Sequence, residues 1–112
     1  MNGEELAAYC LAKPGAWADS PWGEESRVVK VAERIFAFLG EATVGVKCGA
    51  TRAEADEWLR EYPGDAAVMA YLGRSGWNIL TVGEAIPDDV IREAVDESYD
   101  LVVARLPRAR RP

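Results

Sequence analysis

Three apolar runs within residues 27–48 predict consecutive β-strands. The first run, 28–31, is rich in valine, the second, 35–39, is apolar on both faces, and the third, 44–48, alternates. Ala32-Glu33 is short enough to be a two-residue hairpin connection, although it lacks the glycine that favours such turns. We therefore expect an antiparallel meander whose middle strand is the buried one.

Three other segments have apolar residues at helical spacing, and we expect helices over 2–12, 51–62 and 87–106. The second begins at Thr51 with a glutamate three residues later, which is the spacing of a capping box. The third begins at Pro87, a residue favoured at the first helical position. These signals define where the second and third helices start.

A fourth strand is predicted over 76–82, while residues 13–26 and 65–75 are interpreted as loop or irregular structure. The predicted order is α-β-β-β-α-β-α. Because such a sheet must bury one face, we expect an α+β fold in which helices pack on one face of an antiparallel sheet. A single domain covers residues 1–106, and a flexible basic tail covers 107–112.

Composition and charge narrow the function classes. The chain has 112 residues, of which 49% are hydrophobic and 29% charged, and no apolar run approaches the roughly 20 residues of a membrane span. We therefore expect a cytoplasmic protein without a membrane partner. Net charge is −6, with 19 acids against 9 bases in residues 1–104 and four arginines in 105–112. Any contact with nucleic acid must therefore depend on a local basic patch.

The chain contains no histidine, and its two cysteines, Cys10 and Cys48, lie far apart. These facts remove histidine-activated nucleophiles and most zinc sites from consideration. Buried thiols in the core explain both cysteines. We therefore expect a protein that is not an enzyme, with no catalytic residues, no cofactor and no metal site.

Several short motifs occur in an order typical of one family. They are Lys13-Pro14-Gly15 with Pro21-Trp22-Gly23, Val29-Lys30-Val31 with Ile35-Phe36-Ala37, Trp77-Asn78, and Ser98-Tyr99-Asp100-Leu101-Val102-Val103 before Leu106-Pro107. On these residues the chain resembles the MmcQ/YjbR family of small bacterial proteins. The resemblance implies a frataxin-like α+β fold, also described as a double wing, and a role in DNA binding. It implies no catalytic residues. Residues 71–76 lack the histidine that many members carry before the Trp-Asn strand.

Basic residues of the meander, the loops and the tail are the candidate nucleic-acid contacts. Cationic side chains on a strand pair can follow a phosphate backbone, although charged residues also protect sheet edges and solubilise tails. Two tryptophans beside these bases are candidates for stacking on an unpaired base or a flat ligand. The nucleic-acid set is Lys13, Arg27, Lys30, Arg34, Lys47, Arg74, Arg108, Arg110 and Arg111, and the stacking pair is Trp22 and Trp77.

Two other functions remain open at this point. A small aromatic ligand, of the kind met in secondary metabolism or resistance, would use Trp17, Trp22 and Trp77 as a cleft. Alternatively, acidic residues at helical spacing within 89–100 would hold a hard cation weakly, as in frataxin-like proteins, although a solvated helix face explains them equally. We expect DNA as the first partner, an aromatic ligand as the alternative, and a monomer or weak dimer.

Overall fold

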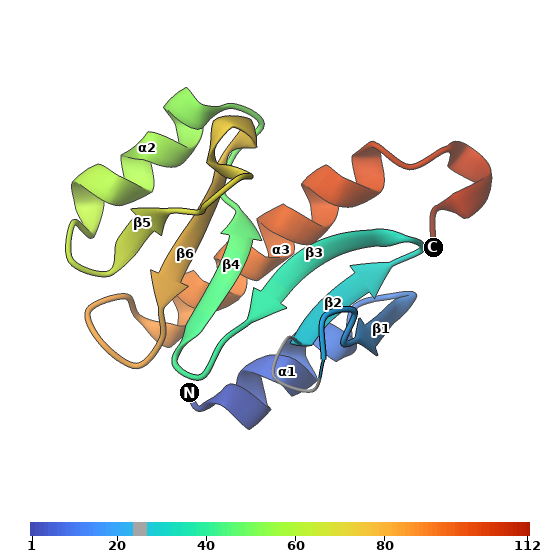
Figure 1. Ribbon diagram of the computed structural model, residues 1–112, viewed down its shortest axis with the longest axis horizontal. Helices are drawn as coiled ribbons and strands as arrows, with labels where there is room; N and C mark the ends of the chain where they lie inside the picture. Colours follow the sequence, from blue (N-terminus) through green and yellow to red (C-terminus); the bar gives the residue numbers. More distant parts are fainter. Residues whose placement is uncertain (24–26) are drawn as a thin grey trace.

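The computed structural model describes residues 1–23 and 27–112. Six antiparallel strands form one sheet in the order β1-β2-β3-β4-β6-β5, and helices are packed against it (Figure 1). This arrangement is the predicted α+β class. The elements are α1 (Gly3–Leu11), β1 (Ala16–Asp19), β2 (Arg27–Val31), β3 (Arg34–Leu39), β4 (Thr43–Lys47), α2 (Arg52–Glu61), β5 (Ala66–Val68), the 3-10 helix η1 (Gly73–Ser75), β6 (Trp77–Thr81), α3 (Asp88–Ala104) and the 3-10 helix η2 (Arg108–Arg110).

Side-chain caps determine where the first two helices begin. The Asn2 side chain accepts a hydrogen bond from the Glu5 backbone N–H at 2.8 Å, and the Glu5 carboxylate accepts one from the Asn2 N–H at 2.9 Å. In α2, Thr51 caps the Glu54 N–H at 3.2 Å, but the Glu54 carboxylate accepts from the Ala50 N–H. Both helices therefore start where polar side chains replace missing backbone partners.

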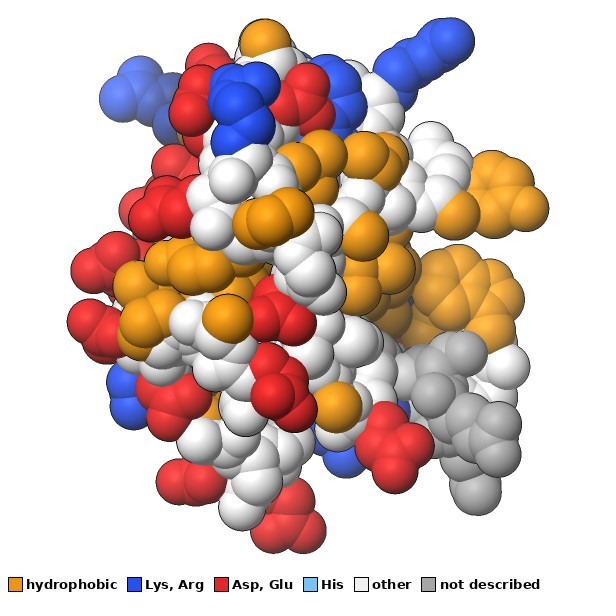
Figure 2. Space-filling view, turned by 90° about the vertical axis from the view of Figure 1, so that its left-hand side faces the viewer, with side chains coloured by type: hydrophobic (Ala, Val, Ile, Leu, Met, Phe, Trp, Pro, Cys, Tyr) orange, Lys and Arg blue, Asp and Glu red, His pale blue; other side chains and the backbone are white. Residues whose placement is uncertain are grey.

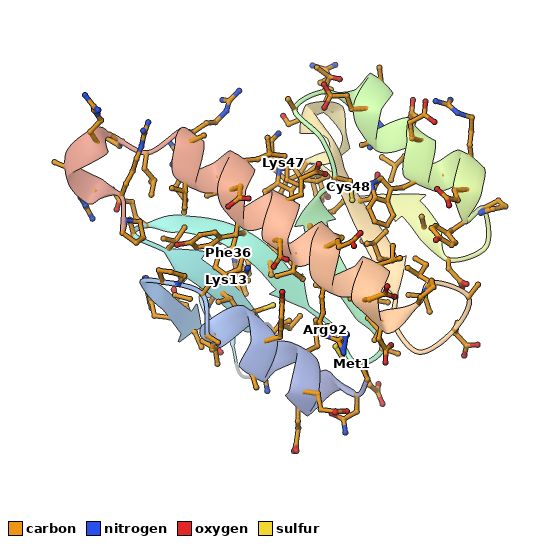
Figure 3. The ribbon with its side chains drawn as sticks, turned by 180° about the vertical axis from the view of Figure 1, so that it is seen from behind. Met1, Lys13, Phe36, Lys47, Cys48 and Arg92 are labelled. Atoms are coloured by element: carbon orange, nitrogen blue, oxygen red, sulfur yellow. The ribbon has the colours of Figure 1, made fainter. Side chains whose placement is uncertain are left out.

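Helices α1 and α3 cover the same face of the sheet, as the view from behind shows (Figure 3). α3 buries Ile91, Val95 and Val102 in the core. Its Ser98 hydroxyl, also buried, donates to the Phe36 carbonyl at 2.6 Å and accepts from the Lys47 backbone N–H at 2.9 Å. Ser98 therefore links α3 to both β3 and β4 by hydrogen bonds.

Helix α2 packs beside β5 and β6. Ala55 is fully buried, and Trp58, Leu59 and Tyr62, the other apolar residues at helical spacing within 51–62, lie against the core. Asn78 of β6 has no exposed surface, and its amide donates to the Ala55 carbonyl at 2.9 Å. The amphipathic pattern of 51–62 therefore predicted the correct face.

Two edge strands differ from the sequence prediction. β1 lies where a loop was expected, and β5 lies in the stretch expected to be irregular. Both are four residues or shorter and form only by pairing with a longer neighbour, Trp17 opposite Lys30 in β1 and Ala67 opposite Ile79 in β5. The expectation about burial was also wrong in detail, because β4 rather than β3 is the most buried strand of the meander.

Residues 107–112 are folded back onto the domain, although the sequence predicted a flexible tail. Arg111 donates from Nε to the Leu106 carbonyl at 2.9 Å and from Nη2 to the Ala104 carbonyl at 3.0 Å. Ala104 is the last residue of α3, so its carbonyl has no partner within the helix, and the Leu106 carbonyl follows just beyond. Arg110 pairs with Glu33 at 2.6 Å. The tail therefore has structural contacts of its own.

The sheet divides into two halves that diverge at one end. β3 and β4 pair only through Ala37–Leu39 and Val44–Val46, and beyond those residues the two strands separate (Figure 1). We call β1-β2-β3 the first half-sheet and β4-β6-β5 the second half-sheet. α3 passes behind the gap between them. None of the described helices has the length and apolar character needed to cross a membrane.

Candidate anion-binding cavity

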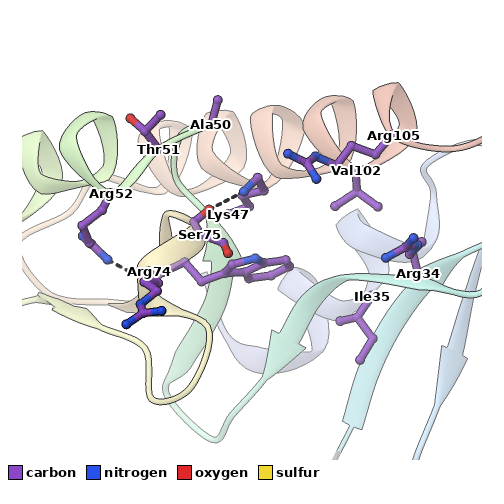
Figure 4. A pocket seen from close by; sticks show the side chains of 11 residues that line it. Arg34, Ile35, Lys47, Ala50, Thr51, Arg52, Arg74, Ser75, Val102 and Arg105 are labelled. Carbon is purple, nitrogen blue, oxygen red and sulfur yellow. Dashed lines mark hydrogen bonds between the residues drawn. The ribbon is translucent and has the colours of Figure 1, made fainter.

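A cavity of about 440 Å³ lies where the two half-sheets separate (Figure 4). Five of the protein's 13 basic residues line it, and no acidic residue does, in a chain whose net charge is −6. We call it the cationic cavity. Its lining residues are Arg34, Ile35, Lys47, Ala50, Thr51, Arg52, Arg74, Ser75, Trp77, Val102 and Arg105.

Lys47 forms the floor of the cationic cavity. Only 6% of the residue is exposed, and its ammonium group donates to the backbone carbonyl of Ser75. No carboxylate of the described residues lies within ion-pair distance of it. Burial lowers the pKa of Lys47, the neighbouring Arg105 lowers it further, and Glu54 partly opposes them. A cation is therefore held here without a negative partner.

A tight turn brings the Ser75 carbonyl to Lys47. Gly76 has a φ of 91°, and a Cβ at this position would overlap the carbonyl oxygen of Gly49. The Gly76 carbonyl in turn accepts from the Cys48 N–H at 2.8 Å. Glycine is therefore needed where η1 returns to the end of β4.

Three exposed arginines, Arg34, Arg74 and Arg105, form the rim of the cationic cavity. None of them forms an ion pair or a side-chain hydrogen bond with any residue in the described parts of the chain. Figure 4 shows Arg105 coming from the end of α3 and Arg34 from β3, both to the right of Lys47, with Arg105 above Arg34. These guanidinium groups are therefore free to meet an anion.

Arg52, the fifth base, is already engaged by the protein. Its guanidinium donates to the Gly73 carbonyl at 2.9 Å, to the Trp77 carbonyl at 3.2 Å and to the Asn78 side chain at 2.6 Å, and its Nε pairs with Asp56 at 2.7 Å. It therefore joins α2 to η1 and β6. We assign it a structural role in holding the cavity wall.

Two lysines of the predicted nucleic-acid set lie elsewhere and are paired. Lys13 forms an ion pair with Asp96 between α1 and α3, and these contacts raise its pKa although burial alone would lower it. Lys30 pairs with Asp19 at 2.8 Å and lies over the Trp17 ring at 5.1 Å. The structure therefore does not place Lys30 with Arg34 and Lys47.

The remaining predicted bases divide between the opposite end of the sheet and the tail. Arg27 begins β2 and pairs in register with Leu39, so it lies at the end of the sheet away from Arg34. Arg110 and Arg111 have the contacts described above, and Arg108 is exposed on η2. Of the nine predicted bases, the cationic cavity brings together Arg34, Lys47 and Arg74.

The structure does not bring the two candidate stacking residues into one cleft. Trp77 is 8% exposed, lines the cationic cavity and packs edge-on against Phe38 with ring centroids 5.6 Å apart. Trp22 is 67% exposed and borders a separate groove of about 240 Å³ with Phe38, Met69 and Ile79. The predicted shared aromatic cleft is therefore absent from the described residues.

Acidic side chains are spread over other surfaces. On the side of the molecule that carries α2 and β5, they cover much of the left and lower parts, whereas most basic side chains in view lie at the top, where α2 begins, with a few acidic ones among them (Figure 2). Asp96 of the predicted cation-binding face is engaged with Lys13 and with the Tyr9 hydroxyl, which donates to it at 2.7 Å. Among the described residues, no three acidic or cysteine side chains form a group suited to a metal ion.

Both thiols are poorly suited to nucleophilic chemistry. Cys10 and Cys48 are buried, and burial raises the pKa of each to about 12. The thiolate is the reactive form of cysteine, so neither residue supplies it at neutral pH. The structure therefore agrees with their interpretation as core residues.

Sequence reasoning missed Arg52 and Arg105 as cavity residues, whereas a topological signal was present for the other three bases of the cavity. In an antiparallel sheet, the start of β3, the end of β4 and the start of β6 lie at the same end. Arg34, Lys47 and Arg74 occupy or adjoin those three positions. Arg105 follows the last turn of α3, and nothing in the sequence indicates that this helix ends over the same gap.

The fold and the cavity define a small α+β domain with a divided antiparallel sheet and an unneutralised cationic hollow at its open end. The chain belongs to the YjbR family, because the family model described as YjbR matches residues 11–101. The uncharacterized YjbR proteins of Escherichia coli K12 and O157:H7 are each 31% identical to it over 115 residues, which cover 99% of this chain and 95% of theirs. The resemblance inferred from the motifs is therefore confirmed.

Two solved structures share the fold. A crystal structure of a Deinococcus radiodurans protein with a DUF419 domain matches with a TM-score of 0.85 and 20% identity, covering 97% of this chain and 84% of that one. A Pseudomonas syringae protein matches with a TM-score of 0.66 and 13% identity, covering 90% and 98%. At these identities the likeness concerns the backbone arrangement alone.

Proposed function

We propose that this protein is a non-enzymatic nucleic-acid-binding protein that receives the phosphates of a DNA strand at the cationic cavity. The observation that carries the proposal is the gathering of five bases, four of which form no ion pair with any described residue, around a single cavity of an acidic protein. Contacts between basic side chains and phosphate supply most of the sequence-independent affinity for nucleic acid. The half-sheets on either side would then act as the two wings that the family resemblance implies.

The distribution of charge explains how an acidic protein can take this role. A long-range field of net charge −6 repels phosphate, but it acts weakly beyond the Debye length of about 8 Å at physiological salt. Close to the cationic cavity, the exposed Arg34, Arg74 and Arg105 dominate instead. The acidic surface elsewhere on the protein would repel the DNA strand and so favour the orientation in which the strand lies against the cationic cavity.

Binding of fluorescently labelled DNA, followed by anisotropy at increasing salt, tests this function. We expect binding at about 50 mM salt that weakens steeply as salt rises. The double variant Arg34→Ala/Arg105→Ala should lower the affinity and reduce the slope of log K against log salt by about 2, since two phosphate contacts are lost. Arg60→Ala is the matched control, because Arg60 is exposed on α2 and paired with Glu57.

Two results with the unaltered protein and the double variant would contradict the proposal. One is an absence of binding at about 50 mM salt, where the electrostatic contribution is strong. The other is a double variant that binds with the affinity and salt dependence of the unaltered protein. Loss of binding in Arg60→Ala equal to that of the double variant would equally assign the effect to net charge rather than to the cationic cavity.

A further inference from the structure

We propose that the cationic cavity takes a dianionic phosphate monoester, with Lys47 at the floor as its innermost contact. Such a group occurs at the end of a nucleic-acid strand and on small phosphorylated molecules. The strand-end form of this inference rests on the proposed function, and the small-molecule form does not.

The buried cation at the floor lacks a negative partner. Lys47 is 6% exposed, and its acceptor is the neutral carbonyl of Ser75. Taking an ammonium group out of water is unfavourable, and an ion pair offsets this cost only when a suitable anion is close. An ammonium has three donors, so two remain after the bond to Ser75. An entering anion would supply the missing partner.

The depth of the site favours a terminal phosphate over an internal one. Lys47 is buried, whereas Arg34 and Arg105 are exposed at the rim. An internal phosphodiester has a strand leaving on both sides and so stays at the level of the rim. A monoester has a single linkage and can enter. The cavity volume of about 440 Å³ lies within the range of about 300–1,000 Å³ typical of small-molecule sites.

The number of converging cations matches a monoester better than a carboxylate. A phosphate monoester carries a charge of about −1.5 to −2 at pH 7 and three strong acceptor oxygens. Lys47, Arg34 and Arg105 approach the same space from β4, β3 and α3 (Figure 4). The N-cap Thr51 and the first residue of α2, Arg52, also line the cavity, so the positive end of the helix dipole adds to the charge. Three separate elements can thus each meet one oxygen.

Calorimetry with small molecules and anisotropy with oligonucleotides test the inference together. The small-molecule probes are inorganic phosphate, a nucleoside monophosphate and the same nucleoside without phosphate. The oligonucleotide probes share one sequence and differ only in a phosphate at the 5′ end, at the 3′ end, or at neither. We expect the monophosphate to bind and the nucleoside not to, and a terminal phosphate to raise oligonucleotide affinity about tenfold.

Variants separate the floor from the rim. Lys47→Met keeps the length of the side chain and removes the charge, so it should abolish the preference for a terminal phosphate while the rim arginines retain salt-dependent binding. Lys30→Met is the matched control, because Lys30 is a partly buried lysine of the same sheet that pairs with Asp19 outside the cavity. It should leave the preference unchanged.

Each outcome distinguishes this inference from the proposed function. Oligonucleotides that bind equally with and without a terminal phosphate, together with a monophosphate that binds no better than its nucleoside, would overturn the inference and leave the proposed function standing. Lys47-dependent binding of the monophosphate without oligonucleotide binding at about 50 mM salt would support the inference and contradict the proposed function. A terminal-phosphate preference that persists in Lys47→Met would also overturn it.

Discussion

Lys13 and Lys47 lie on opposite sides of α3 and show two different uses of a shielded cation (Figure 3). Lys13 pairs with Asp96 and lies 5.3 Å from the centre of the Tyr9 ring and 5.8 Å from that of Tyr99. Lys47 has a backbone carbonyl and no carboxylate. Accordingly, the pKa of Lys13 is raised and that of Lys47 is lowered.

The comparison separates charges that hold the fold together from charges that are left available. At the junction of α1 and α3, Asp96 forms an ion pair with Lys13 and accepts a hydrogen bond from the Tyr9 hydroxyl, so all three polar groups have partners. At the cationic cavity, the fold keeps an unpaired charge that costs free energy. Sites where a protein leaves a charge unpaired at a cost in stability are often functional. We therefore place the proposed binding site at the cationic cavity.

The largest loss of stability is expected from a substitution of Arg52, the arginine of the cationic cavity to which we assign a structural role. Arg52→Met leaves the carbonyls of Gly73 and Trp77 and the buried Asn78 side chain without their donor. We expect the free energy of unfolding to fall by about 2–3 kcal/mol, measured by urea denaturation. Arg60→Met, which removes an exposed arginine from the same helix, should change it by less than about 0.5 kcal/mol. Equal stabilities for the two variants would mean that Arg52 is available for a ligand.

The next largest loss of stability is expected from a substitution of Asp96 at the junction of α1 and α3, and it depends on pH. Burial would raise the pKa of Asp96, but hydrogen bonds from Lys13 and Tyr9 hold it below its ordinary value of 3.8. A carboxyl with a lowered folded pKa stabilises above the unfolded pKa, and this contribution disappears as pH falls through the folded value. Because Asp96 is partly exposed, we expect Asp96→Asn to cost about 1 kcal/mol at pH 7.

Thermal denaturation of both proteins at neutral and acid pH measures this difference. The gap between the unaltered protein and Asp96→Asn should close as pH falls through the lowered pKa of Asp96, because both proteins then carry a neutral side chain at this position. Glu93→Gln is the control, since Glu93 is exposed on α3. A gap that persists unchanged in acid would show that the ion pair is not its cause.

The smallest change in stability is expected from a substitution of Lys47. Its pKa lies below the ordinary value of 10.5, so the charged form weakens the fold below the folded pKa, and this penalty disappears as pH rises through 10.5. Lys47→Met should therefore leave the free energy of unfolding at pH 7 unchanged within about 0.5 kcal/mol, or raise it. Lys13→Met, in contrast, should lower it by about 1 kcal/mol, because Asp96 loses its partner. A loss above about 2 kcal/mol in Lys47→Met would make its ammonium a structural group.

The amino-acid sequence by itself determined most of the secondary structure and the family. Helical spacing and caps such as Asn2 and Thr51 specify local hydrogen bonds, so they can be recognised within a few residues of chain. The three runs of the meander and the strand at Trp77 are also local patterns. The edge strands β1 and β5 could not be predicted, because strands this short depend on a neighbour that is distant in sequence.

Only the tertiary structure decided which charges meet. Lys30 and Arg34 are four residues apart, yet one pairs with Asp19 and the other faces the cationic cavity. Arg105 reaches that cavity because α3 ends over the gap between the two half-sheets. Whether a base acquires a carboxylate partner depends on strand divergence and helix packing between remote segments. No local pattern records those contacts, and they separate the structural Lys13 from the unpaired Lys47.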